Sequence, residues 1–187
     1  TFNGCDGVPI EFDFIVTPVL EVDFIADTIL CAGEEFPGVN FSGNVPSLSF
    51  EWTNNNISIG LPSNGTGDVS SFIVSNSGVV DQSATITVTP ILVGCTSNDS
   101  EFTITVKPVP TVSVVPLSQT LCHDEATIPV DFSGNITSAI YSWSHDDISI
   151  GIGTPGFADI PSFTATNTSL VSETSTFIVT PSFNGCV

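Results

Sequence analysis

The feature that most limits how this chain can fold is an internal repeat with a spacing of 91 residues. Cys31 recurs as Cys122, and Trp52 recurs as Trp143, each at that offset. Four longer motifs share it: 41–44 with 132–135, 57–60 with 148–151, 71–72 with 162–163, and 88–90 with 179–181. A period of this length suits one small β-sandwich per repeat and is too long for one turn of a solenoid.

The repeat also predicts where each copy begins and ends. The tetrapeptide at 2–5 reappears at 183–186, and 16–18 match 106–108 at an offset of 90. We therefore expect 1–18 to be the last hairpin of a preceding copy, with 11–16 as its final strand. Residues 19–108 form a complete copy, the first module. Residues 109–187 form the second module, which lacks its last strand and should expose an open sheet edge.

The pattern of apolar residues predicts an all-β fold. Segments 48–52, 84–89, 101–107 and 139–143 alternate between apolar and polar residues, as half-buried strands do. Turn-forming residues punctuate the chain every 8–12 residues, and no window has helical periodicity. We predict tandem Ig-like antiparallel β-sandwiches with a period of about 91 residues.

The charge balance excludes several classes of function. Twenty acidic residues face a single basic one, Lys107, and the net charge is −19. Binding to nucleic acid or to an anionic lipid surface requires many Lys or Arg side chains. We therefore expect neither kind of binding. No apolar run reaches 18 residues, so we expect no membrane insertion.

Each copy carries a tryptophan that could either stack on a carbohydrate or fill the core. In an Ig-like sandwich, a buried tryptophan of the third strand packs between the sheets. The alternating neighbours of these tryptophans share their face, and a recurring Ser-Phe pair follows in each copy. We therefore predict as core residues Trp52, Trp143, Phe50, Tyr141, Phe72 and Phe163.

The two histidines, which could carry chemistry, do not recur between copies. His123 and His145 align with Ala32 and Asn54, and we expect both histidines to be ordinary loop residues. An active site would need them paired with a nucleophile or with metal ligands. The sequence predicts a protein that is not an enzyme.

The carboxylates favour structural roles in the same way. Acidic pairs occur at 34–35, 124–125 and 146–147, and the last aligns with two asparagines at 55–56. Asp68 and Asp159 do recur, each after a glycine-containing turn, and we expect them to cap nearby backbone N–H groups. Clustered carboxylates could bind Ca²⁺, but the sequence contains no calcium-binding loop motif. We predict no cofactor.

Five cysteines without a Cys-x-x-Cys pair indicate an oxidising compartment rather than a zinc site. One cysteine precedes the second strand of each copy, namely Cys31 and Cys122, and one occupies each last hairpin, namely Cys5, Cys95 and Cys186.

The reach of a disulfide limits how these cysteines can pair. In an Ig-like sandwich the two positions lie at opposite ends, farther apart than the roughly 7 Å between Cα atoms that a disulfide allows. Modules stacked end to end would instead bring Cys186 beside Cys31 and leave the other three unpaired here. Two alternatives remain open: neighbour pairs (Cys5 with Cys31, Cys95 with Cys122), and free thiols.

The repeated motifs together resemble a known class of domain. The Cys-x-x-Glu segment, the Phe-Ser-Gly tripeptide, the tryptophan followed by Ile-Ser-Ile-Gly, and the final Val-Thr-Pro and Asn-Gly-Cys are similar to PKD-like repeats of giant Bacteroidota surface adhesins of the SprB gliding-motility type. The resemblance covers essentially the whole chain. The sequence differs from that of PKD domains proper after Trp52, where Thr53 and three asparagines follow.

This resemblance implies an extracellular, cell-surface protein that the type IX secretion system exports. It implies the stalk of a long adhesive filament whose partners are neighbouring repeats, while other regions contact surface polysaccharide or a substratum. It also implies an O-glycosylation motif at 27–29, with Thr28 as the acceptor. A glycan- or cell-binding module and a non-catalytic appendage of a secreted hydrolase are the alternative functions.

Overall fold

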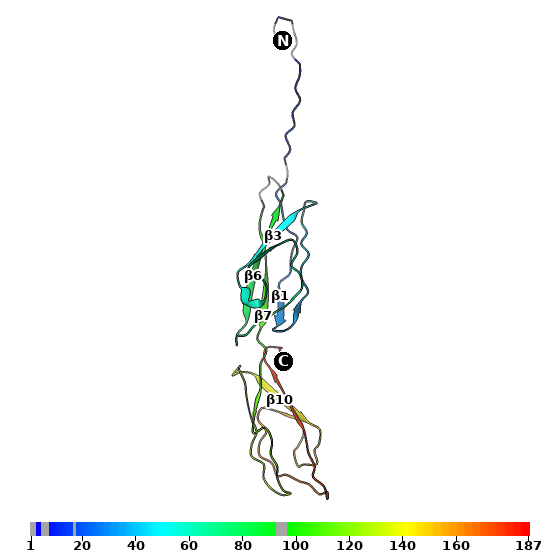
Figure 1. The fold of residues 1–187 in the computed structure, drawn as a ribbon, viewed down its shortest axis with the longest axis vertical. Helices are drawn as coiled ribbons and strands as arrows, with labels where there is room; N and C mark the ends of the chain where they lie inside the picture. The colour runs from blue at the N-terminus through cyan, green and yellow to red at the C-terminus, as the bar shows by residue number, and fades with distance from the viewer. Residues whose placement is uncertain (1–2, 5–7, 17, 93–96) are drawn as a thin grey trace.

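We describe the fold from a computed structural model, in residues 3–4, 8–16, 18–92 and 97–187. The chain forms two β-sandwiches arranged end to end, with the C-terminus at the joint between them (Figure 1). Residues 8–16 extend away from the first module (Figure 1) and, contrary to the expectation for 11–16, form no strand; their apolar side chains are exposed. The described residues contain no α-helix, so the predicted all-β sandwich fold is confirmed.

The first module is built around a five-stranded sheet with the order β1-β7-β6-β3-β4. Its strands are β1 (Thr28–Cys31), β3 (Ser49–Asn54), β4 (Asn64–Thr66), β6 (Gln82–Ile91) and β7 (Ser100–Lys107). Neighbours run antiparallel except β1, which pairs in parallel with β7 so that Cys31 lies opposite Lys107. The β1–β7 pair thus brings Cys31 to the end of the module where the chain leaves β7.

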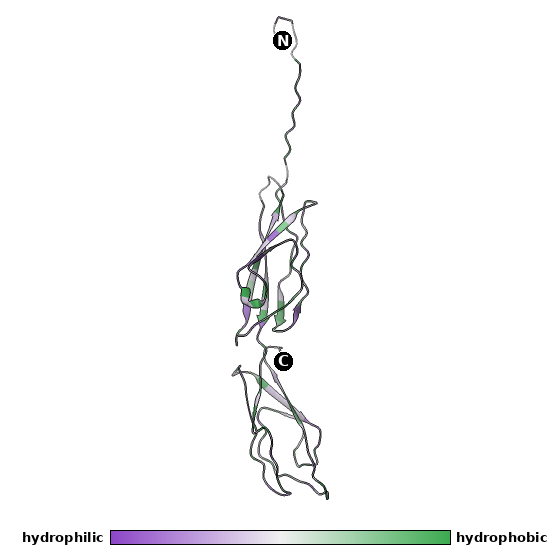
Figure 2. Cartoon of the chain, viewed as in Figure 1, coloured by the Kyte–Doolittle hydropathy of each residue, from purple (hydrophilic) through white to green (hydrophobic). Residues whose placement is uncertain are grey.

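A smaller layer covers this sheet and closes the first core. It contains β2 (Glu35–Phe36) paired with β5 (Phe72–Ile73), and a bridge between Val39 and Val69. Apolar and polar residues interleave along β3, β6 and β7 (Figure 2), because one face of these strands is buried and the other is more exposed. The turn η1 (Ile57–Ile59) folds back so that Ile59 is buried in the same core.

The second module repeats part of this arrangement. Its elements are β8 (Ser113–Val115) paired with β9 (Asp131–Ser133), and a sheet of β11 (Gly156–Phe157), β10 (Ile140–His145) and β12 (Phe177–Ser182). β10 and β12 stand where β3 and β6 stand in the first module, 91 residues earlier. Its fully buried cluster contains Phe132, Trp143, Ile152 and Ile160, far fewer side chains than the first core.

The two modules differ at one sheet edge. β6 pairs with β3 on one side and with β7 on the other. In the part of the chain that the structure describes, β12 pairs with β10 alone, and its second edge carries no strand. The smaller second core follows from this difference, because β7 supplies three of the buried side chains of the first core.

The predicted core aromatics lie inside the modules. Trp52 is 7% exposed and Trp143 is 8% exposed, and Phe50 is buried beside Trp52. Phe72, Tyr141 and Phe163 are half-buried and pack against the same two cores.

A glycine lies across the strand from each tryptophan. Gly65 pairs with Trp52 and Gly156 with Trp143, and each indole ring lies close to its glycine. A Cβ atom built on Gly156 would lie 2.8 Å from Cζ2 of Trp143, and one on Gly65 would lie 2.2 Å from Cζ2 of Trp52. The recurring Gly-x-x-Asp motif therefore begins with a residue that has to lack a side chain.

We expect Gly156→Ala to lower the free energy of unfolding of the second module by about 1–3 kcal/mol, because the added methyl group overpacks the core. Gly153→Ala is the matched control, since nothing lies within 4 Å of its Cβ position. Chemical denaturation of both variants measures the difference. Equal stability of the two variants would mean that the indole can move away at no cost.

Candidate functional site: the joint between the modules

A disulfide joins the two modules. Cys31, the last residue of β1, is bonded to Cys186, and their Cα atoms are 5.7 Å apart. This is the inter-module pairing that the sequence favours, and the separation lies within disulfide geometry. The bond connects residues 155 positions apart and ties the end of the first module to the last hairpin of the second.

The hairpin that carries Cys186 is a tight two-residue turn. Phe183 and Cys186 exchange both backbone hydrogen bonds, each with an N···O distance of 2.9 Å. Asn184 and Gly185 between them have φ angles of 48° and 90°. Asn-Gly is the pair that best adopts two successive positive φ angles, so the Phe-Asn-Gly-Cys motif fixes the position of the thiol.

The only basic side chain of the sequence lies at the same joint. Lys107 ends β7 opposite Cys31, and its Nζ donates a 2.8 Å hydrogen bond to the Asn184 carbonyl in the Cys186 hairpin. A charged donor makes this hydrogen bond stronger than one between neutral groups. A covalent bond and a charge-assisted hydrogen bond therefore cross the joint side by side.

The linker at 107–110 is packed rather than free. Both of its prolines are buried. The Lys107 carbonyl accepts a 2.9 Å hydrogen bond from the Ala32 N–H in the first module. The Val109 carbonyl accepts one of 3.4 Å from the Asn135 side chain in the second module. The linker thus bonds to both modules.

The other cysteines fall into two groups. Cys122, the counterpart of Cys31, is exposed and has no disulfide partner among the described residues. Cys5 and Cys95 lie outside the described residues. The alternative that pairs Cys5 with Cys31 conflicts with the bond that Cys31 makes to Cys186.

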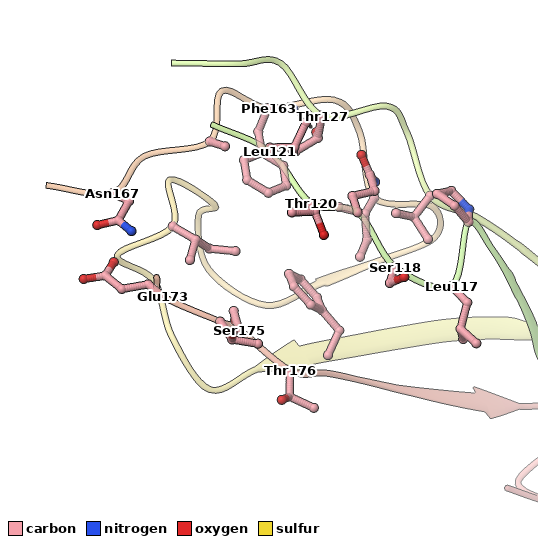
Figure 3. Close-up of a pocket in the computed structure, with 18 of the residues that line it drawn as sticks. Leu117, Ser118, Thr120, Leu121, Thr127, Phe163, Asn167, Glu173, Ser175 and Thr176 are labelled. Atoms are coloured by element: carbon pink, nitrogen blue, oxygen red, sulfur yellow. Dashed lines mark hydrogen bonds between the residues drawn. The ribbon is translucent and has the colours of Figure 1, made fainter. Parts of the chain in front are cut away.

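A cavity of about 710 Å³ opens in the second module (Figure 3). One wall is formed by 117–123, and the opposite wall by 172–177 and Val179. Its floor contains Phe132 and Ile160 of the second core. The cavity therefore exposes the inside of the sandwich rather than a pocket on its surface.

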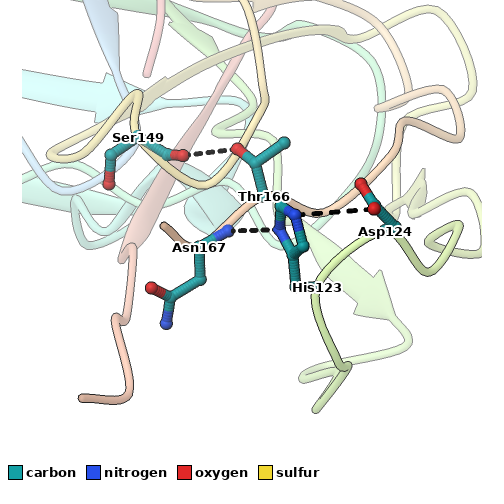
Figure 4. Close-up of polar contacts among 5 residues, drawn as sticks. All are labelled: His123, Asp124, Ser149, Thr166 and Asn167. Carbon is teal, nitrogen blue, oxygen red and sulfur yellow. Dashed lines mark hydrogen bonds and ion pairs between the residues drawn. The ribbon is translucent and has the colours of Figure 1, made fainter. Parts of the chain in front are cut away.

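His123 lines this cavity and connects two loops through hydrogen bonding (Figure 4). Its Nδ1 accepts a 3.1 Å hydrogen bond from the Asn167 backbone N–H, and its Nε2 lies 3.5 Å from the Asp124 carboxylate. The nearby Thr166 hydroxyl donates to the Ser149 carbonyl at 2.5 Å and not to the imidazole. The ring therefore accepts a hydrogen bond from the backbone of the loop that contains Asn167.

The structure corrects the expectation that His145 lies in a loop. It is the last residue of β10, and its ring centroid lies 6.0 Å from that of Trp143. Its Nε2 lies 2.7 Å from the Gly153 carbonyl. In the first module, Asn54 donates from the same position to the Pro62 carbonyl at 3.2 Å. The imidazole and the amide thus serve one structural purpose.

The acidic pair at 146–147 also has an uncharged equivalent. Asp146 accepts a 2.8 Å hydrogen bond from the Thr176 backbone N–H, as Asn55 accepts one of 2.8 Å from Thr85. Backbone N–H donors from Thr176 and Ser149 hold the pKa of the Asp146 and Asp147 carboxyls below their ordinary value. A charged aspartate in one module and a neutral asparagine in the other thus accept the same backbone hydrogen bond.

The remaining acidic pairs and turns bind backbone as well. Glu34 accepts a 2.7 Å hydrogen bond from the Cys31 N–H, and Glu125 accepts one of 2.6 Å from Cys122. Among the described residues, no three His, Cys, Asp or Glu side chains gather as metal ligands.

Asp68 and Asp159 do not cap local turns as the sequence suggested. Each accepts a hydrogen bond from an N–H group 27 residues earlier in the chain, Phe41 at 2.9 Å and Phe132 at 2.7 Å. These bonds connect the Phe-Ser-Gly segment of each module to the segment that contains the recurring aspartate.

Thr28 lies half-buried in the edge strand β1, where it pairs with Ile104. Within the described ranges, no helix is both long and apolar enough to cross a bilayer. No family model and no curated protein sequence matches this chain.

Proposed function

We propose that this chain is a stalk segment of a long, secreted cell-surface filament. The joint is the observation that carries the proposal: a disulfide, a charge-assisted hydrogen bond and a packed linker act at one point. Such a joint suits a spacer that transmits force along a row of domains. It is more elaborate than two independent binding modules need.

The chemistry of the chain supports this role outside the cell. The disulfide suits an oxidising environment, and the net charge of −19 favours solubility. The partners are the neighbouring repeats. Contact with surface polysaccharide or a substratum, export by the type IX system and a part in gliding motility follow from the resemblance to Bacteroidota adhesins.

The rival function, a glycan- or cell-binding module, calls for an exposed aromatic that recurs in each copy. Phe24 and Phe157 are exposed, but their counterparts are Val115 and Thr66. The recurring apolar loop that follows η1 points inward instead, with Leu61 and Ile152 buried. We therefore favour the stalk over the binding module, and propose no enzyme activity.

Residual dipolar couplings, which report the orientation of each module, test the stalk proposal. We expect one alignment tensor to fit both modules of the oxidised chain, and two tensors in Cys31→Ser, where the joint is freed. Cys122→Ser, which removes the thiol without a partner among the described residues, should still give one. If the oxidised wild type already needs two tensors, the joint is a hinge and the proposal fails.

A further inference from the structure

The open edge of β12 lies beside the cavity of the second module. In the first module, the corresponding edge of β6 pairs with β7, and β7 in turn pairs with β1. The counterpart of β1 is 119–122, which forms part of the cavity wall opposite Phe177 and Val179 of β12. The cavity therefore occupies the position that one β-strand fills in the first module.

The strand that fills this position in the first module has a specific pattern of side chains. Phe102, Ile104 and Val106 alternate along β7 and are buried in the core. A strand that closes the second module thus needs large apolar residues at alternate positions, and two free backbone edges.

Residues 8–16 have this pattern. At the repeat offset of 90 residues, the counterparts of the three buried side chains of β7 are Phe12, Phe14 and Val16. They are 75%, 86% and 92% exposed, and the segment lies extended in solvent (Figure 1). A long, exposed apolar strand is prone to pair with an open sheet edge.

We propose that residues 8–16 of one copy of this chain insert into the cavity of a second copy as its missing strand. The inserted strand runs antiparallel to β12 and parallel to 119–122. In the first module, Thr103 lies opposite Thr85. Asp13 is the counterpart of Thr103 and Thr176 is the counterpart of Thr85, so the same register places Asp13 opposite Thr176. This inference goes beyond the proposed function, because it links separate chains.

One polar contact supports the same site. In the first module, the Asn76 side chain donates hydrogen bonds to the Val80 carbonyl at 2.8 Å and to the Val106 carbonyl of β7 at 2.7 Å. Its counterpart Asn167 lines the cavity and donates to the Val171 carbonyl at 2.8 Å. The inserted strand would offer the Val16 carbonyl as the second acceptor.

In this proposal the inserted segment 8–16 comes from another molecule. The first module lies between the segment 8–16 of a chain and that chain's own second module (Figure 1). Each chain carries a net charge of −19, so the repulsion between two chains opposes their association. Added salt screens this repulsion, and assembly should therefore strengthen as the salt concentration rises.

Light scattering of the full chain tests the proposal. We expect the mass to rise above 19.5 kDa with protein concentration, and more so in high salt. The double variant Phe12→Ser/Phe14→Ser should stay monomeric. Ile15→Ser is the matched control and should still assemble, because the counterpart of Ile15 is Thr105 on the outer face. A wild-type chain that stays monomeric throughout overturns the proposal, as does a double variant that assembles equally well.

A peptide of residues 8–16 tests the site itself. Added to the full-length double variant, it should protect backbone amides in 119–121 and 174–179 from hydrogen exchange. The peptide with both phenylalanines changed to serine should not. An Asp13→Cys chain should also form a mixed disulfide with a Thr176→Cys chain. Protection at another edge, or none, overturns the proposal, and neither result alters the dipolar-coupling test of the joint.

Discussion

Replacing Trp52 by alanine is expected to lower the free energy of unfolding of the first module by about 3–5 kcal/mol. The indole is 7% exposed and belongs to the cluster that joins the two layers. Gly65 leaves room for the flat ring and offers no side chain to fill the space after truncation. The variant therefore loses both the transfer free energy of the ring and its packing contacts.

Far-UV circular dichroism during denaturation is the suitable measurement for this variant. Trp143 is then the only remaining tryptophan, so its fluorescence follows the second module separately. Ile57→Ala is the control, because Ile57 is 67% exposed and should change stability by less than about 0.5 kcal/mol. A loss below about 1 kcal/mol for Trp52→Ala would show that the indole is not a core residue.

Replacing Cys186 by serine is expected to lower the free energy of unfolding of the second module by about 2–5 kcal/mol. The disulfide closes a loop of 155 residues, which restricts the unfolded chain. Cys186 is also buried in the joint, so its removal loosens the hairpin that Lys107 contacts.

Denaturation of three variants isolates the contribution of the bond. Cys31→Ser, Cys186→Ser and the double variant should lose similar stability, because each removes the same disulfide. Cys122→Ser should match the wild type. If a reducing agent destabilises Cys186→Ser as much as it does the wild type, the loss comes from another bond.

The strands were predictable where one face is buried along several residues. The alternation at 84–89 and 101–107 appears as β6 and β7, and that at 48–52 as β3. The pairing of β1 was not predictable, because its four residues run parallel to a strand more than 70 positions away. Local pattern carries no information about such a partner.

The joint was predictable only in part. The stacking of repeats and the reach of a disulfide favoured the Cys31–Cys186 bond, but they left neighbour pairing and free thiols open. The contact between Lys107 and the Asn184 carbonyl left no signal, since it depends on the placement of one long side chain. The repeated Gly-x-x-Asp motif did carry a signal, but its meaning required the position of Trp52 across the strand.

Comparison of the two copies identifies positions where polar residues exchange, but it does not give their roles. Asn54 and His145 stand at one position and bind equivalent carbonyls, and so do Asn55 and Asp146 with backbone N–H groups. A position that accepts both a neutral and an ionisable side chain is selected for hydrogen-bonding geometry. Alignment shows the exchange, but only coordinates show the shared partner.

The position of Lys107 has a consequence for proteolysis. A protease that cleaves after basic side chains finds one candidate peptide bond in these 187 residues, and that bond leads into a buried proline at the end of β7. Cys31 precedes this bond and Cys186 follows it. Cleavage there would produce two fragments that the disulfide still holds together, so a single cut would not sever the chain.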